Sequence, residues 1–133
     1  MHVLTLHYAP LDVCLGVRES RAPAITVVSV TGDVDETALP AFAHGLDSGI
    51  DEAARSVIVD LTRVDFLGLS GLQALAVAKM RADCNRVDLL LVPGGRCVLR
   101  PLVVSGLLDR FSRFRSVQAA VDSILAAPGS RAG

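Results

Sequence analysis

The sequence predicts one α/β domain built on a mostly parallel sheet, and three observations support this prediction. Short apolar runs typical of strands alternate with stretches whose apolar residues follow helical spacing. The run at 57–59 is apolar without interruption, which is typical of a strand buried on both faces of a parallel sheet. The chain has 133 residues, the length of a single domain. We therefore expect one domain over 1–126 and a frayed polar tail over 127–133.

The first half of the chain predicts two strands and a helix. Residues 1–12 indicate a weak extended lead-in. Apolar residues alternate over 13–17, and a β-branched run covers 25–30, so the short turn between them favours an antiparallel pair. Apolar residues then recur at helical spacing over 39–50, with Thr37 as the expected N-cap.

The second half continues the alternation of strands and helices. We expect, in order, a strand at 57–59, a helix over 72–80, a strand at 87–92, a helix that stops at Gly106, a short strand near 111–114 and a helix over 117–125. Pro101 should kink the third helix, and Ser116 should cap the last one. Such an order predicts that binding residues gather beyond the carboxyl ends of the parallel strands.

The composition excludes several classes of function. The 13 basic and 14 acidic residues nearly balance and Trp is absent, so neither charge nor aromatic content indicates a nucleic-acid partner. No apolar run approaches the roughly 20 residues that a membrane-spanning helix needs. The N-terminus lacks a basic start before an apolar stretch, so we expect no signal peptide and a cytoplasmic protein. No pattern predicts a cofactor or a metal site.

The three cysteines, Cys14, Cys84 and Cys97, do not form a recognisable framework. Their number is odd and no C-x-x-C occurs, which disfavours a set of disulfides or a zinc site. Buried or half-buried thiols are the expected state. A regulatory disulfide, Cys84–Cys97 or Cys14–Cys84, is the alternative. Cys84 and Cys97 should flank one strand, which would hold them too far apart to bond.

The segment 62–70 is predicted as a loop that leads into a helix, and Ser70 is its most informative residue. Ser70 and Gln73 form the S-x-x-Q pattern of a capping box, and Gly71 leaves the first helical turn bare. A phosphate on this serine would lie at the positive end of a helix dipole and would add about two negative charges. The alternative is that Ser70 caps a helix and does nothing more.

A hydrolase using Ser70 is a remote alternative. The sequence GLSGL resembles the G-x-S-x-G nucleophile elbow, but Leu72 stands where the second glycine is required. The histidines, His2, His7 and His44, all precede the serine, whereas that class of enzyme needs one after it. We therefore expect His44 to be a surface residue and the protein not to be an enzyme.

A second loop, predicted at 31–36, carries Asp33 and Asp35. Paired carboxylates can bind a metal or act as acid and base, but no third ligand is near in the sequence. A turn in which these side chains bond to local backbone is favoured. Because both predicted loops follow neighbouring strands, we expect the two acids to lie at the same rim as Ser70.

Three stretches of this sequence resemble the anti-sigma-factor antagonist family of STAS domains. They are VVSVTGDVDETALP at 27–40, SVIVDLTRVDFLGLSGLQAL at 56–75 and VLRPLVVSGLLDRFSRFRSVQAAV at 98–121, and the second is the most specific. Together with the intervening strand they cover most of the chain from about residue 24 onward. The resemblance implies an α/β fold, a STAS-like mixed sheet of about four to five strands flanked by about four helices.

The resemblance also implies a function. Members of this family bind a cognate anti-sigma factor, which is often a serine kinase, and so release a sigma factor. Phosphorylation of a serine at the position of Ser70 abolishes that binding, and a phosphatase reverses it. Asp35 matches the acidic loop residue of the family. We expect a partner-binding surface made of Asp33, Asp35, Phe66, Leu67, Gly68, Leu69, Ser70 and Gly71.

The sequence departs from the family pattern beside Ser70. Gly68 and Leu69 stand where the family usually has Asp and Ser. Two hypotheses therefore stay open. In the first, the chain is an anti-sigma-factor antagonist switched at Ser70. In the second, it is a STAS protein-binding module that is not phosphorylated, and the cysteines could add redox control to either.

Overall fold

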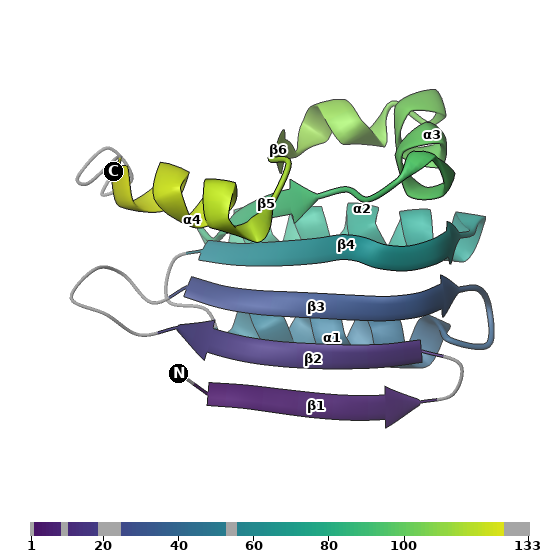
Figure 1. Cartoon of the computed structure of the whole chain (residues 1–133), viewed down its shortest axis with the longest axis horizontal. Helices are drawn as coiled ribbons and strands as arrows, with labels where there is room; N and C mark the ends of the chain where they lie inside the picture. Colours follow the sequence, from purple (N-terminus) through teal and green to yellow (C-terminus); the bar gives the residue numbers. More distant parts are fainter. Residues whose placement is uncertain (1, 9–10, 19–24, 53–55, 127–133) are drawn as a thin grey trace.

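The structure is a computed structural model that describes the backbone of residues 2–8, 11–18, 25–52 and 56–126, and the side chains of 25–51 and 56–126. Its elements follow in this order (Figure 1): β1 (His2–Tyr8), β2 (Leu11–Arg18), β3 (Ile25–Val34), α1 (Leu39–Glu52), β4 (Ser56–Leu67), α2 (Leu69–Cys84), β5 (Asp88–Val92), α3 (Arg96–Val104), the short 3-10 helix η1 (Leu107–Arg110), β6 (Ser112–Arg113) and α4 (Val117–Ala126). The predicted tail at 127–133 and the predicted turn at 20–23 lie outside the described residues.

The described strands form one sheet in the order β1-β2-β3-β4-β5-β6. β2 runs antiparallel to both β1 and β3, whereas β3, β4, β5 and β6 run parallel to one another. The predicted fold class, a mixed α/β sheet flanked by four helices, is confirmed. Within the described residues the sheet has six strands rather than four to five, because the lead-in expected at 1–12 supplies β1 as an edge strand.

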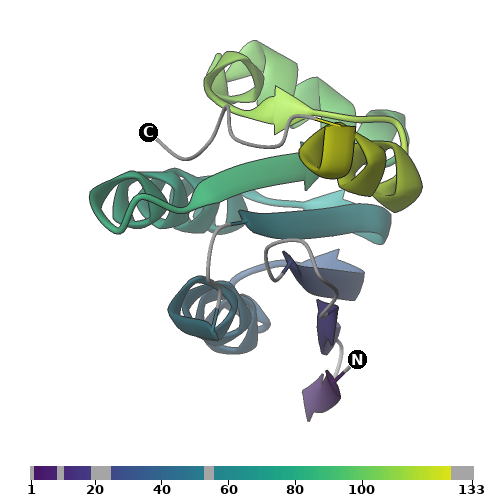
Figure 2. The same ribbon diagram turned by 90° about the vertical axis from the view of Figure 1, so that its left-hand side faces the viewer.

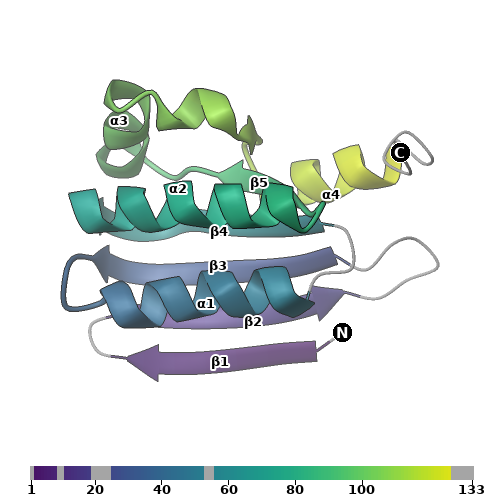
Figure 3. The ribbon, with the colours of Figure 1, turned by 180° about the vertical axis from the view of Figure 1, so that it is seen from behind.

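Helices cover both faces of the parallel part of the sheet. α1 and α2 lie side by side on one face (Figure 3), and α4 lies on the opposite face (Figure 2). The larger core lies under α1 and α2 and contains Phe42 and Leu75, both completely buried. A smaller core under α4 contains Ile58 and Val121. This split follows from strand geometry, because successive side chains of β3 and β4 point to opposite faces.

The segments predicted as loops, 31–36 and 62–70, are largely strand. β3 continues to Val34 and β4 continues to Leu67, and these two residues pair in parallel register. Both side chains are buried, so the extension removes apolar surface from water. The predicted loops were wrong because polar residues between the apolar ones are tolerated on the solvent side of a pleated strand.

The start of α1 corrects a second prediction. Thr37 is exposed and is not the N-cap, since the helix begins at Leu39. A turn precedes the helix, and in it Oδ1 of Asp35 accepts a hydrogen bond from the N–H of Ala38 at 3.0 Å. The carboxylate of Asp35 therefore satisfies a backbone donor that the helix itself leaves open.

The last two helices confirm their predicted boundary signals. Gly106 follows α3 with a φ of 77°, in the left-handed region that favours glycine, as expected for the predicted stop. Pro101 lies inside α3, and the kink expected there stays a prediction. Ser116 caps α4 as predicted, because its Oγ accepts a hydrogen bond from the N–H of Ala119 at 3.0 Å. β6 lies where a short strand was expected, near 111–114.

The cysteines are placed on either side of β5 as expected. Cys84 ends α2 and Cys97 lies in the first turn of α3. Both thiols are free and exposed, so the expectation of buried or half-buried thiols is wrong for this pair, and neither alternative disulfide involving Cys84 is formed. The side chain of Cys14 lies outside the described residues.

Candidate functional site

The junction between β4 and α2 consists of one residue, Gly68. β4 ends at Leu67 and α2 begins at Leu69, so strand passes into helix almost without a connection. The N–H of Gly68 donates a hydrogen bond to the carbonyl oxygen of Val34 at 2.9 Å. The ends of β3 and β4, which carry the two groups of predicted site residues, are thereby tied together.

Ser70 lies in the first turn of α2, but the predicted capping box is wrong. The N-cap of α2 is Gly68, so no side chain caps this helix at its N-cap position. The N–H of Leu72 donates a hydrogen bond to the carbonyl oxygen of Gly68 at 3.1 Å. The helix starts earlier than the S-x-x-Q pattern indicates because β4 leads directly into it. Ser70 is half-buried and still lies at the positive end of the helix dipole.

Gly71 allows α2 to approach the ends of the strands closely. A Cβ atom at this position would lie 2.6 Å from Cδ1 of Leu67 and 2.8 Å from Cγ1 of Val34. Both distances are well below normal contact between carbon atoms. Any side chain at position 71 would therefore displace either the helix or the two buried side chains beneath it.

The predicted partner-binding residues divide into exposed and buried groups. Phe66 is 50% exposed and Leu69 is 70% exposed, so both present apolar surface at the rim beside Ser70. Leu67 is 2% exposed and Gly71 is buried, so the side chain of Leu67 and the Cα of Gly71 cannot contact a partner. These two residues instead pack beneath the exposed side chains of the rim. The sequence did not separate the groups because it did not show that β4 extends to Leu67.

The two acids lie at the same rim as Ser70, as expected. Asp33 is exposed and pairs in register with Phe66 at the end of β4. Asp35 is half-buried, and its carboxylate bonds to the turn before α1, which is the structural role that the sequence favoured. In the part of the chain that the structure describes, no group of three or more His, Cys, Asp or Glu side chains could hold a metal ion.

A groove between α1 and α2, with a volume of about 260 Å³, was not predicted from the sequence. Its lining residues face one another from the two helices: Leu39, Ala43, Leu46 and Asp47 of α1, and Ser70, Gln73, Ala74 and Val77 of α2. Ala43 and Ala74 carry single methyl groups, which leaves the space open. Ser70, the first of these residues along α2, lines one end of this α1–α2 groove.

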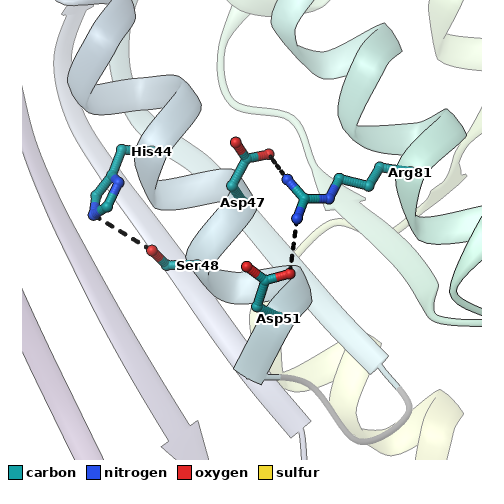
Figure 4. Close-up of polar contacts among 5 residues, drawn as sticks. All are labelled: His44, Asp47, Ser48, Asp51 and Arg81. Carbon is teal, nitrogen blue, oxygen red and sulfur yellow. Dashed lines mark hydrogen bonds and ion pairs between the residues drawn. The ribbon is translucent and has the colours of Figure 1, made fainter.

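Arg81 joins the same two helices at the other end of the α1–α2 groove (Figure 4). Its guanidinium forms ion pairs from α2 to two carboxylates of α1, at 2.9 Å to Asp47 and 3.0 Å to Asp51. Asp47 also lines the groove. His44, on the solvent side of α1, is exposed as predicted, and its Nε2 lies 3.5 Å from Oγ of Ser48.

Comparisons with known proteins agree with this architecture. The family model described as STAS domain matches residues 19–120. The anti-sigma-F factor antagonist RsfB of Mycobacterium tuberculosis is 25% identical over 100 residues, which cover 75% of this chain and 81% of that protein.

Within the described ranges, every helix is too short or too polar to cross a bilayer.

Solved structures show the same fold. An anti-sigma factor antagonist from Mycobacterium paratuberculosis superposes with a TM-score of 0.72 and 24% identity, covering 85% of this chain and 94% of that chain. The Bacillus cell fate determinant SpoIIAA in its phosphorylated form gives a TM-score of 0.60 and 16% identity, covering 83% of this chain and 98% of that one. Because the family model also matches most of the chain, this protein belongs to the STAS domain family.

Proposed function

We propose that this protein is an anti-sigma-factor antagonist, which binds a cognate anti-sigma factor in the cytoplasm and so releases a sigma factor. The observation that supports this most is the relative in Mycobacterium tuberculosis, which carries that name and aligns over 75% of this chain. We also propose that residues 1–126 act as one STAS domain. The chain would act by binding alone, as a switchable module and not as an enzyme.

The proposed contact surface is the rim around Ser70. Phe66 and Leu69 are large apolar side chains exposed to solvent, and Asp33 lies beside them. Exposed apolar side chains gathered next to polar ones are typical of protein interfaces. Gly68 and Asp35 hold the backbone of this rim in place through their hydrogen bonds.

The proposed switch is phosphorylation of Ser70. A serine kinase, which could be the anti-sigma factor itself, would transfer the γ-phosphoryl group of ATP to Oγ as the hydroxyl proton leaves, and a phosphatase would hydrolyse the ester. Ser70 is half-buried at the start of α2, within the proposed contact surface. A new charge left unpaired in an interface costs about 2–5 kcal/mol of binding free energy.

A pull-down from the native host tests both parts of this proposal. Mass spectrometry would identify the captured anti-sigma factor and determine whether the Ser70 peptide carries phosphate. Binding of the purified partner is then compared for wild type, Ser70→Ala and Ser70→Glu. We expect Ser70→Ala to bind like wild type and Ser70→Glu to bind more weakly. Equal binding by Ser70→Glu would contradict the switch while leaving the antagonist function intact.

An unphosphorylated binding module is the second candidate, and Gly68 and Leu69 favour it because they replace residues that usually accompany the phosphate acceptor. It predicts partner binding with no phospho-form under any candidate kinase. Redox modulation would then act through Cys84 or Cys97, the two exposed thiols. A thiol count with and without oxidant, compared with partner binding, separates this candidate from the first.

A serine hydrolase is the remote alternative. The described side chains offer Ser70 no histidine partner, since His44 contacts Ser48 instead. A nucleophilic serine needs a base within about 3.2 Å. Labelling of the protein by a serine-directed fluorophosphonate at Ser70 would support this alternative, and absence of labelling would remove it.

A further inference from the structure

We infer that the α1–α2 groove receives an amphipathic helix of the anti-sigma factor, so that the partner-binding surface continues from the Ser70 rim along the length of α2. This inference rests on the proposed function and specifies which surface the partner contacts and how. It adds Leu39, Ala43 and Val77 to the contact residues, none of which the rim contains.

The dimensions of the groove suit side chains better than a small ligand. Its volume of about 260 Å³ falls below the range of roughly 300–1,000 Å³ that is typical of small-molecule pockets. Ala43 of α1 and Ala74 of α2 are the smallest side chains in its lining, which also includes the apolar side chains of Leu39 and Val77. A partner helix inserts a few apolar side chains into such a groove at a spacing of three or four residues.

The outer face of α2 continues the apolar surface. Leu69, Val77 and Met80 are 70%, 61% and 59% exposed, although α2 also buries Leu75 in the core. Exposed Gln73 lies on the same side of the helix, between Leu69 and Val77, and exposed apolar side chains gathered with a polar one are typical of a contact surface. From Leu69 to Met80 the stripe extends about 16 Å, at 1.5 Å per residue, which matches about three turns of a partner helix.

Charge at the groove favours a partner with basic residues. Along α1, Asp47 and Asp51 share the single charge of Arg81. The end of the groove away from Ser70 therefore carries one net negative charge, and a lysine or arginine side chain flanking the apolar anchors of the partner helix there would complement it.

The groove also gives the proposed switch a physical basis. Ser70 lines one end of the α1–α2 groove, so a phosphate on its Oγ would lie at the end of this mostly apolar groove. An apolar side chain of the partner placed there would strip water from the dianion without replacing its hydrogen bonds, which is unfavourable. Phosphorylation would thus weaken binding without any change in the fold.

The test is calorimetry with the purified anti-sigma factor recovered from the host. Ala43→Leu fills the groove and Val77→Glu places a charge in its wall, and we expect each to weaken binding by at least about tenfold. Ala126→Leu and Leu125→Glu make the same changes on α4, on the opposite face of the sheet, and should bind within about twofold of wild type. Circular dichroism confirms that each variant folds.

Each outcome distinguishes the groove from the proposed function. If the wild-type chain binds no anti-sigma factor, the proposed function is wrong. If wild type binds and the groove variants bind equally well, the function stands and the groove inference is wrong. Light scattering of the chain alone tests the remaining possible occupant, a second copy of this chain. A wild-type dimer that Val77→Glu converts to a monomer would assign the groove to that second copy and overturn the inference.

Discussion

The N–H of Gly68 donates a hydrogen bond to the carbonyl oxygen of Val34 across 2.9 Å, and this bond joins the two segments that carry the candidate site. Asp33 and Asp35 flank Val34 in the sequence, and Leu69 and Ser70 follow Gly68. The proposed contact surface, which is assembled from these two distant segments, is thus held in one arrangement by the extended pairing of β3 with β4.

Replacement of Gly71 should destabilise the fold by about 1–3 kcal/mol, because overpacking a filled site costs that much. We expect this for Gly71→Ser, whose Cβ would lie 2.6 Å from Cδ1 of Leu67. Gly95→Ser is the matched control, since a Cβ there meets nothing within 4 Å. Urea unfolding would measure both free energies, and equal stability of the two variants would show that the close approach at Gly71 relaxes freely.

Leu67 and Leu69 should separate stability from binding. Leu67→Ala removes a buried side chain and should lower the free energy of unfolding by about 2–5 kcal/mol. Leu69→Ala truncates an exposed side chain and should change that free energy by less than about 0.5 kcal/mol. Only Leu69→Ala is expected to weaken partner binding in a fully folded protein. A Leu69→Ala variant that binds like wild type would exclude this side chain from the contact surface.

Asp35 should matter for stability and Asp33 should not. Asp35→Ala removes the carboxylate that accepts the N–H of Ala38, and losing a cap of this kind costs about 1 kcal/mol. Asp35→Asn keeps an oxygen acceptor and should recover most of that loss. Asp33→Ala, at an exposed neighbouring position, is the control. Thermal unfolding of the three variants, together with partner binding, distinguishes an acid that caps the turn from one that contacts the partner.

Arg81→Met should lower the free energy of unfolding by about 0.5–1 kcal/mol, since both ion pairs are exposed. The loss should shrink in about 1 M salt, where charges on the surface are screened. Lys79→Met is the control, because Lys79 pairs with Asp83 within one helix and such pairs contribute about 0.3–0.5 kcal/mol. A loss at Arg81 that does not depend on salt would show that packing of its aliphatic part, and not charge, joins α1 to α2.

Much of the fold followed from local patterns. The alternation of strands and helices predicted the parallel part of the sheet. Ser116 and Gly106 marked helix boundaries because capping depends on residues only a few positions apart. The shared rim of Asp33 and Ser70 also followed, because the carboxyl ends of neighbouring parallel strands meet at one edge.

Other features depended on contacts between distant segments. β4 extends past its polar residues because Leu67 pairs with Val34 of β3. Since α2 follows β4 almost directly, this extension also determines where α2 begins. The capping box at Ser70 failed for this reason. The α1–α2 groove requires Ala43 and Ala74 to line the same space, and helical spacing alone does not show which faces of two helices meet.

The one-residue junction at Gly68 has a kinetic consequence. Because strand passes directly into helix, the backbone of the proposed contact surface has little freedom to lose when a partner arrives. Encounter with the anti-sigma factor should therefore behave as the docking of a preformed shape, with a single exponential phase whose rate rises linearly with partner concentration. A modification at Ser70 would then shorten the lifetime of the complex far more than it slows the encounter.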